Sequence, residues 1–236
     1  MAVQYSTCSA FDLNLHRSTA DVGLDSGDDI LNALETMDYV VPARRIVCRS
    51  RDLYDVVPMM CEGWAASAIT LSDGSRQILS FLLPGDLVST TLLFDAAPHC
   101  MVEAVTDVRY RTFKRADLKL ALFQSPALFD RLSKSWVEEK KRSDQLAIDL
   151  GRRTADERIA RLILGLKERL EKLGMVSGQS FEFPLRQHHI ADATGLTPVH
   201  VSKVLSEFRR SGLIEINGRA LTIRDPQAFQ RIATLR

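Results

Sequence analysis

The side chains with the clearest chemical potential in this chain lie around residue 200. His200, Ser202 and Lys203 place imidazole, hydroxyl and ammonium groups within four consecutive residues, and Ser206 and Arg209 follow at helical spacing. Such groups donate hydrogen bonds to phosphate oxygens and to acceptor atoms on the edges of bases. Contacts of this kind with nucleic acid require a rigid element that carries the side chains into a groove.

The surrounding sequence predicts that element. Residues 184–216 have the pattern of a short helix, a turn at Gly195 and a second helix. Glycine readily adopts the positive φ of such a turn, Thr197 is placed to cap the second helix, and Pro198 occupies its first turn, where no amide hydrogen is needed. The expected buried face of the second helix consists of Val201, Val204, Leu205 and Phe208. This pattern predicts a helix-turn-helix, and the alternative is a helical hairpin within an ordinary core.

A β-hairpin is expected directly after the second helix. Residues 212–223 contain two apolar runs on either side of Asn217-Gly218, a sequence that strongly favours a two-residue hairpin turn. A helix-turn-helix followed by a hairpin is a winged helix. Arg219, at the tip of this wing, could reach a phosphate.

The charge of the chain is divided unevenly along its length. The formal net charge is only +1, yet residues 152–236 hold 15 Lys and Arg against 9 Asp and Glu, whereas residues 1–151 hold 16 against 21. A basic C-terminal part fits binding of double-stranded DNA confined to that part. A solvated basic face would give the same counts, so the charge supports the motif without replacing it.

The first half of the chain predicts a β-domain. Residues 1–29 are polar and are expected to form a flexible tail, and residues 30–120 contain short strands separated by Gly, Pro and Asp turns. The expected strands cover residues 38–48, 56–63, 66–71, 77–83, 102–106 and 109–114. We therefore expect an α+β protein with an N-terminal β-roll or jelly-roll domain, a long helix, and a winged helix-turn-helix in residues 152–236.

The long helix is expected within residues 121–151 and begins at Ser125-Pro126, a cap followed by a proline at the first helical position. Gly151 is a candidate hinge, and Thr154 is expected to cap the next helix. Seven residues at alternating three- and four-residue spacing form a candidate seam for a parallel homodimer: Phe129, Leu132, Trp136, Glu139, Ser143, Leu146 and Leu150. The alternative is that this stripe packs on the β-domain of its own chain.

Several other function classes lack a signal in the sequence. Cys8, Cys48, Cys61 and Cys100 are scattered without a C-x-x-C pair, so we expect reduced thiols, no metal and no disulfide framework. No phosphate loop, nucleophile elbow or metalloprotease motif is present, which predicts that the chain is not an enzyme. The absence of a long apolar run and of a signal peptide predicts a cytoplasmic protein without a membrane partner.

The combination of these parts resembles the Crp/Fnr superfamily of bacterial transcription regulators. The resemblance covers residues 30–235, and the sequences DGSRQI at 73–78, FLLPGD at 81–86 and ADERIA at 155–160 carry it together with the helix-turn-helix. It implies that the β-domain senses a signal, that the long helix dimerises, and that the second helix of the motif binds a palindromic promoter site. It also implies recruitment of RNA polymerase, usually as an activator.

The resemblance assigns roles to individual residues of the motif. It implies that Arg186 and Gln187, and then Thr197 and His200, contact phosphates. It places Val199, Ser202 and Lys203 at the base-reading positions. The family commonly has Glu and, four residues later, Arg at the positions of Val199 and Lys203. Valine cannot accept a hydrogen bond from cytosine but could contact a thymine methyl group, and lysine is a point charge, so the target sequence is expected to differ.

The sensor differs from cyclic AMP-binding members of the superfamily. Those members hold the nucleotide with a Glu and an Arg-Ser pair, where this chain has Thr90 or Thr91 and Pro98-His99. Because a phosphodiester would lose its cationic partner, no high-affinity cyclic AMP binding and no cofactor are expected. A single cysteine in the tail also argues against a four-cysteine iron–sulfur cluster. Two alternatives stay open for the switch: an unidentified small effector, and oxidation of Cys8, Cys61 or Cys100.

Overall fold

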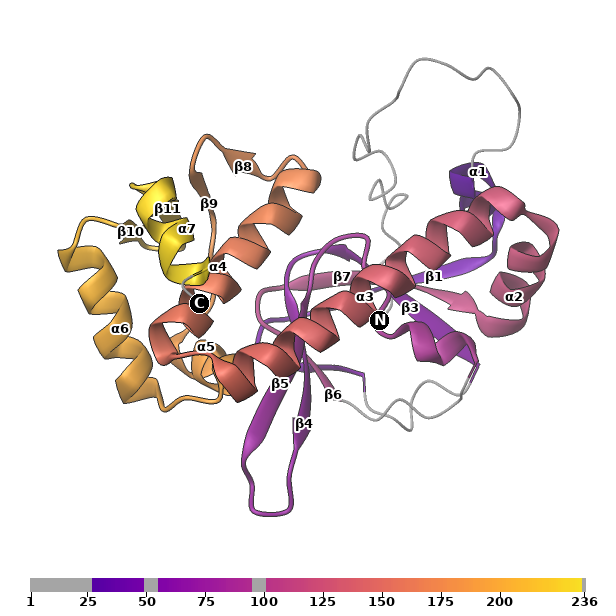
Figure 1. Cartoon of the computed structure of the whole chain (residues 1–236). Helices are drawn as coiled ribbons and strands as arrows, with labels where there is room; N and C mark the ends of the chain where they lie inside the picture. The colour runs from indigo at the N-terminus through magenta and orange to yellow at the C-terminus, as the bar shows by residue number, and fades with distance from the viewer. Residues whose placement is uncertain (1–26, 49–54, 95–100, 235–236) are drawn as a thin grey trace. The chain divides into compact units, whose positions relative to one another are not determined.

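The computed structural model describes residues 27–48, 55–94 and 101–234, so residues 1–26 of the expected tail and two of the four cysteines lie outside the described residues, whereas residues 27–29 of that tail begin a helix. The chain forms two compact units. The first contains residues 1–70 and 79–142, and the second contains residues 71–78 and 143–236 (Figure 1). The α+β class expected from the sequence is confirmed.

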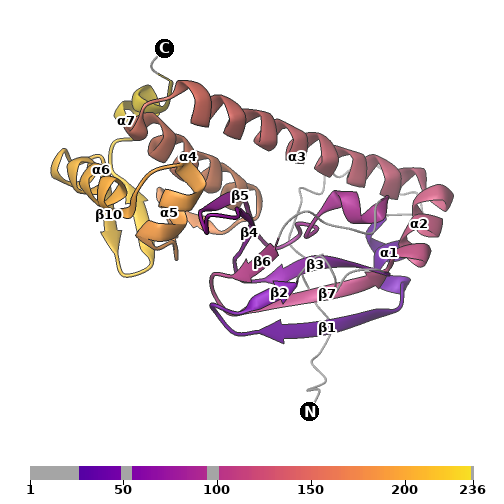
Figure 2. The same ribbon diagram turned by 90° about the horizontal axis from the view of Figure 1, so that it is seen from below.

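The first unit combines short strands with three helices. Its elements are α1 (Gly27–Ala33), β1 (Thr36–Val41), β2 (Ile46–Cys48), β3 (Val56–Glu62), β4 (Ala65–Thr70), residues 79–82 of β5 (Arg76–Leu82), the 3₁₀ helix η3 (Thr90–Leu93), β6 (Met101–Ala104), β7 (Val108–Lys114), α2 (Arg115–Gln124) and the start of α3 (Pro126–Arg152). The strands form two antiparallel sheets, with orders β1-β7-β3 and β2-β6-β4-β5. Figure 2 shows β1, β7 and β3 side by side.

The prediction of one strand over residues 38–48 is wrong, because the chain forms two strands that belong to different sheets. Pro42 follows β1 and has no amide hydrogen to donate to a ladder. Arg44 then adopts a φ of 65°, a left-handed conformation that interrupts extended structure. Helices α1 and α2 were not predicted, although the five other expected strands match β3 to β7 within two residues.

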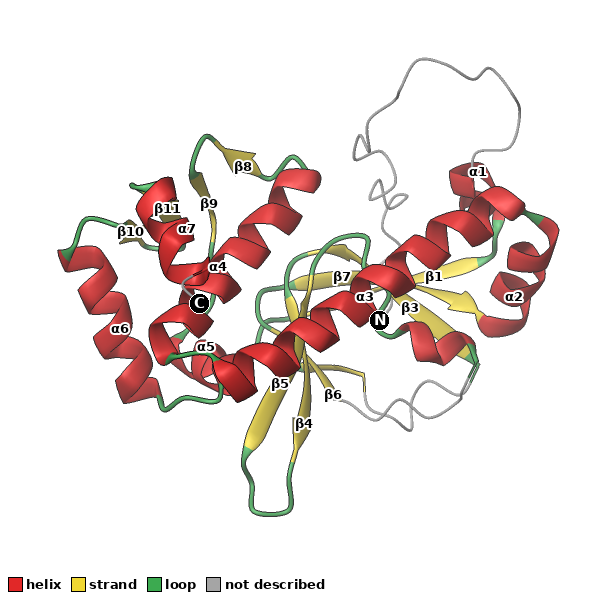
Figure 3. Cartoon of the chain, in the orientation of Figure 1, coloured by secondary structure: helices red, strands yellow, loops and turns green. Residues whose placement is uncertain are grey.

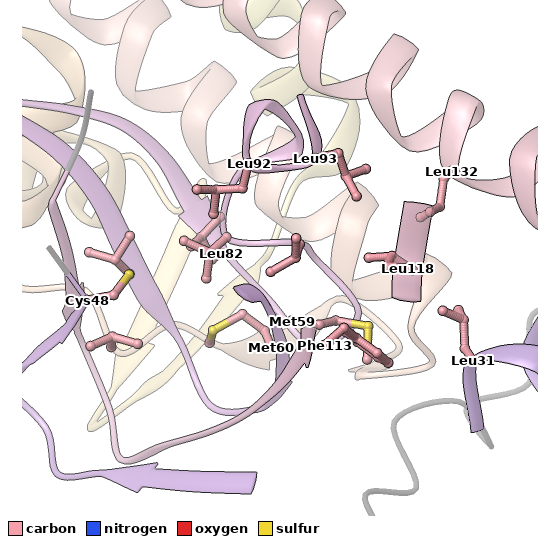
Figure 4. Packing of buried hydrophobic residues seen from close by; sticks show 14 of the residues in the cluster. Leu31, Cys48, Met59, Met60, Leu82, Leu92, Leu93, Phe113, Leu118 and Leu132 are labelled. Carbon is pink, nitrogen blue, oxygen red and sulfur yellow. The ribbon is translucent and has the colours of Figure 1, made fainter. Parts of the chain in front are cut away.

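The core of the first unit lies between the two sheets and under the helices. It includes Met60 and Phe113 from the first sheet, Leu118 from α2, and Leu92 and Leu93 from η3 (Figure 4). These side chains have at most 1% of their surface exposed. Burial of one such large apolar side chain stabilises a fold by about 1.5–3 kcal/mol, so the core fixes the position of each helix that contributes to it.

Helix α3 begins as predicted, because the amide of Leu128 donates a hydrogen bond to Oγ of Ser125 at 3.2 Å. The helix then runs through Gly151 to Arg152 without a break at the glycine. Leu128 and Leu132, from the first two turns, belong to the core of the β-domain. This end of the helix therefore covers its own domain.

The second unit contains the predicted winged helix-turn-helix with additional elements. These are α4 (Ala155–Lys172), β8 (Val176–Ser177), β9 (Ser180–Glu182), α5 (Gln187–Thr194), α6 (Pro198–Arg210), β10 (Ile214–Asn217), β11 (Ala220–Ile223) and α7 (Pro226–Thr234) (Figure 3). Thr154 caps α4 in a reciprocal pair of hydrogen bonds with Glu157, as expected for a capping box. The strands form one antiparallel sheet of order β10-β11-β9-β8, of which the sequence predicted the β10–β11 hairpin alone.

Candidate nucleic-acid interface

The turn between α5 and α6 has the geometry predicted for a helix-turn-helix. Gly195 ends α5 with φ 66° and ψ 34°, and its amide donates to the carbonyl of Ala191. Oγ1 of Thr197 accepts a hydrogen bond from the amide of His200 at 3.2 Å, and Pro198 is the first residue of α6. Gly195, Thr197 and Pro198 therefore each have the role in the turn or cap that the sequence predicts.

The inner face of α6 is buried throughout. Val201, Val204, Leu205 and Phe208 are all less than 8% exposed, which confirms the predicted apolar face. The ring of Phe208 meets the ring of Phe229 on α7 edge to face, with 5.3 Å between the centroids. Helix α6 is thus held firmly along its length, as a helix that reads DNA must be.

The outer face of α6 carries the predicted contact residues. Val199, His200 and Lys203 are exposed, and Ser202 is half-buried. Val199 and Lys203 are one helical turn apart and project from the same face. The first two turns of α6 therefore present an apolar group, an imidazole, a hydroxyl and an ammonium group together, while Thr197 is exposed at the cap.

Three cations near the motif are available for phosphate. Arg186, Lys203 and Arg219 are exposed, and none of them forms an ion pair with a described residue. By contrast, Arg210 pairs with Glu207 and Arg224 pairs with Glu215. All three were assigned to DNA contacts from the sequence.

The N-terminus of α5 also favours binding of an anion such as phosphate. Arg186 and Gln187 are both exposed at this end, where backbone amides and the helix dipole favour negative charge. Arg219 lies in the hairpin turn of the wing, next to Gly218, whose φ is 60°. The positions expected to contact phosphates are therefore solvent-accessible in the second unit.

His188 and His189 are adjacent on α5 but lie in different environments. His188 is exposed, but His189 is 6% exposed, and its Nδ1 accepts a hydrogen bond from the amide of Arg186 at 3.1 Å. Burial, followed by the positive charges of His188, Arg76 and Arg186, lowers the pKa of His189 to about 4. His189 is therefore a neutral cap of α5, and the described part of the chain contains no cluster of metal ligands.

Arg158 positions the motif but was missed by the sequence analysis. Its Nη1 donates to the carbonyl of Thr194 at 3.1 Å, and its Nε donates to the carbonyl of Arg153 at 2.9 Å. The side chain thereby ties the end of α5 to the start of α4. A guanidinium that bridges two carbonyl groups leaves no local pattern in sequence, so only the fold reveals this role.

The seven residues of the candidate seam on α3 occupy different environments. Leu132 is 8% exposed and packs in the β-domain core, as the alternative interpretation of the stripe required (Figure 4). Trp136 packs against the same core and contacts Phe94 and Phe129 edge to face. Ser143 is exposed, and Leu146 and Leu150 are half-buried. The large apolar side chains of α3 that are at least half exposed are Phe129, Val137 and Ile148.

The sensor region places Thr90 against the long helix. Oγ1 of Thr90 donates a hydrogen bond to Glu139 at 2.7 Å, and Phe94 at the end of η3 meets Trp136 one turn away. Pro98 and His99 lie outside the described residues. The resemblance placed a ligand-binding Glu at Thr90 or Thr91, and of these two residues Thr90 donates to α3.

The expectation that the thiols are reduced is wrong for Cys61. Cys61 lies in β3, is 2% exposed and is disulfide-bonded, whereas Cys48 is a buried thiol. Cys8 and Cys100 lie outside the described residues. Scattered cysteine spacing does not reveal which residues a β-domain brings together, so the sequence could not predict this bond.

Comparisons with known proteins agree with this architecture. A model of the Crp-like helix-turn-helix domain matches residues 157–232, and a model of the cyclic nucleotide-binding domain matches residues 40–125. The chain is 31% identical to the transcriptional activator protein FnrL of Cereibacter sphaeroides over 80% of this chain and 77% of that protein. It is 30% identical to the transcriptional activator protein Anr of Pseudomonas protegens over 83% of this chain and 82% of that protein.

A solved structure has a similar fold over most of this chain. The structure of FixK2 from Bradyrhizobium japonicum matches with a TM-score of 0.75 and 25% identity, covering 84% of this chain and 98% of that chain. The fold and the exposed polar face of α6 together define a DNA-binding transcription regulator. The chain belongs to the Crp/Fnr family, whose members are regulators rather than enzymes. Among the helices described, none has the length and apolar character needed to span a membrane.

Proposed function

We propose that this protein is a homodimeric activator that binds a palindromic promoter site through α6. The observation that carries the proposal is the group of unpaired, exposed cations around a rigidly packed α6. A helix-turn-helix dimer contacts two half-sites about 34 Å apart, so each α6 would enter the major groove once per half-site. The protein would act in the cytoplasm, where its promoters are.

The contacts divide into two kinds. Arg186 and Gln187 at the start of α5, Thr197 and His200 at the start of α6, and Arg219 on the wing would contact phosphates and fix the register. Val199, Ser202 and Lys203 would reach base edges. Lysine donates to N7 and O6 of guanine, so Lys203 would favour G·C at the base pair that it contacts.

Dimerisation would use the solvent-exposed side of α3. Phe129, Val137 and Ile148 are each about half exposed, and a second copy of the helix would cover them. Trp136, Glu139 and Ser143 would lie at the edge of that contact, with Leu146 and Leu150 toward the end of the helix. The names of the relatives FnrL and Anr describe activators, which supports recruitment of RNA polymerase as the output.

The salt dependence of binding tests both DNA recognition and the dimer. Each phosphate contact contributes a slope of about −0.9 to log affinity against log salt for duplex DNA. Arg219→Ala removes one contact per protomer, so it should reduce the slope by about 1.8 for a dimer and by about 0.9 for a monomer. Lys172→Ala removes an exposed cation from the end of α4 and should leave the slope unchanged. Binding that is independent of salt would contradict the proposal.

A redox switch is a second candidate for the sensor, because Cys61 is disulfide-bonded. Reduction by dithiothreitol would convert the disulfide to two thiols and consume two electrons and two protons. If this bond controls DNA binding, dithiothreitol should change the affinity of the parent protein and leave that of Cys61→Ser unchanged. Cys48→Ser, which alters a different buried cysteine, should respond like the parent. Equal affinity of the parent in both states would rule out this switch and favour a small effector.

A further inference from the structure

Val199 is an apolar side chain in an unusual place. It is 81% exposed, which makes it the most exposed large apolar residue described in the second unit. It projects from the outer face of α6, among polar and charged side chains. The other three apolar residues in the first two turns of α6 lie on the inner face and are buried. Isolated exposed apolar residues are common, but this one occupies a surface that otherwise forms hydrogen bonds.

The local structure holds the side chain of Val199 in a fixed direction. It is the second residue of α6, directly after Pro198, and the cap formed by Thr197 orders the turn. A β-branched side chain in a helix has one strongly preferred χ1 rotamer, so little entropy is lost when its methyl groups contact a partner. Val199 therefore presents two rigid methyl groups at the end of the helix.

The chemistry of a valine restricts what it can recognise in the major groove. It has no hydrogen-bond donor or acceptor, and it would leave the amino group of cytosine without a partner. The C5 methyl group of thymine is the apolar group that an unmodified base pair displays there. Lys203, one turn away, supplies a donor for an adjacent acceptor.

We propose that Val199 reads the methyl group of one thymine in each half-site and so specifies a T·A pair at that position. This inference rests on the proposed function, because it requires α6 to lie in the major groove. At the position where the resemblance places a hydrogen-bonding Glu, this chain would instead make a contact between methyl groups. Specificity at this position would then come from shape and burial.

Deoxyuridine provides a direct test, because it lacks only the C5 methyl group of thymidine. The palindrome that the full chain enriches from random duplex DNA is resynthesised with each thymidine replaced in turn, symmetrically in both half-sites. Loss of one buried methyl group corresponds to about fourfold in affinity, or roughly fifteenfold for two half-sites. For the parent, we expect this decrease in affinity at one position of the half-site. At that position only, deoxyuridine should change the affinity of Val199→Ala much less than that of the parent.

Two controls make the result specific. Met175→Ala removes a partly exposed apolar side chain from the loop before β8 and should keep the parent response at every position. Replacement of thymidines at the other positions should affect the parent and Val199→Ala equally. Folding of Val199→Ala is verified by its retained salt-dependent binding to duplex DNA.

The outcomes separate this inference from the proposal on which it rests. If the parent enriches a palindrome but every deoxyuridine replacement affects the parent and Val199→Ala alike, the reading of thymine by Val199 is overturned and the proposed function stands. If no palindrome is enriched, both are overturned.

Discussion

The amide of Arg186 donates a hydrogen bond to Nδ1 of His189, so a buried imidazole caps the first helix of the DNA-binding motif. The exposed guanidinium of Arg186 and the buried ring of His189 thus belong to one local structure. A capping contact at this place fixes the backbone from which the phosphate contacts project. Its dependence on a neutral imidazole has a measurable consequence.

Acidification should destabilise the protein through His189. Its pKa is lowered to about 4 in the fold, compared with an ordinary value of 6.5, so the unfolded chain binds the extra proton first. The stabilising contribution is complete above about pH 6.5 and is lost as the pH falls toward about 4. Urea unfolding of the full chain, followed by circular dichroism across this window, should show the decrease.

Two variants separate the contribution of His189 to the pH dependence of stability from the contribution of carboxylates, which also bind protons at acidic pH. His189→Gln should show a weaker pH dependence than the parent between about pH 6.5 and 4. His200→Gln alters an exposed imidazole and should retain the dependence of the parent. Identical pH profiles for His189→Gln and the parent would contradict the assignment.

Gly195 should be intolerant of a side chain. Its φ of 66° is unfavourable for other residues, and an added Cβ would lie 3.1 Å from Cδ2 of Leu150. Gly195→Ala should lower the free energy of unfolding by about 1–2 kcal/mol. Gly165→Ala, at an open helical position in α4, should instead raise it by roughly 0.5–1 kcal/mol. Denaturant titrations of both variants decide the matter, and equal shifts would show that the turn is not constrained.

Lys203 and Arg186 should affect DNA binding in different ways. Lys203→Ala should reduce the discrimination between the enriched site and a single-base variant, by up to about 1–3 kcal/mol, because it removes a contact with a base edge. Arg186→Ala should weaken binding to all sequences about equally, because it removes a contact with a phosphate. Fluorescence anisotropy with both duplexes measures the two effects. If Arg186→Ala lost discrimination between the two duplexes and Lys203→Ala did not, the assignment of the base contact to Lys203 and of the phosphate contact to Arg186 would be contradicted.

The β-domain should not bind cyclic AMP tightly. Thr90 is one of the two positions, with Thr91, at which the resemblance places the ligand-binding Glu of cyclic AMP-binding members, and its hydroxyl donates to Glu139. A polar side chain already engaged with α3 would have to give up that bond to contact a nucleotide. Titration calorimetry of the full chain should show no saturable heat with cyclic AMP, and a tight isotherm would overturn the expectation.

Local chemistry explains which parts of the fold could be predicted from the sequence. The turn at Gly195, the caps at Thr154 and Thr197, and the hairpin at Asn217-Gly218 are each determined by residues within a few positions of one another. Their predictions are confirmed. The buried face of α6 was equally clear, because its apolar spacing has a single helical period.

Long-range packing explains what the sequence did not reveal. The stripe on α3 could face a second copy or its own domain, and only the fold shows that Leu132 enters the β-domain core. The burial of His189, the bridge formed by Arg158 and the disulfide of Cys61 depend on neighbours that are distant in the chain. Residue type and spacing contain no record of such neighbours.

Selection of binding sites from random duplex DNA by the purified, ligand-free full chain, followed by sequencing, tests the central claim most directly. We predict enrichment of a two-fold palindrome whose half-sites lie about one helical turn apart, near 34 Å. The selection is performed with and without dithiothreitol, so that the state of Cys61 is controlled. The absence of any enriched palindrome in both conditions would contradict a dimeric reader built on α6.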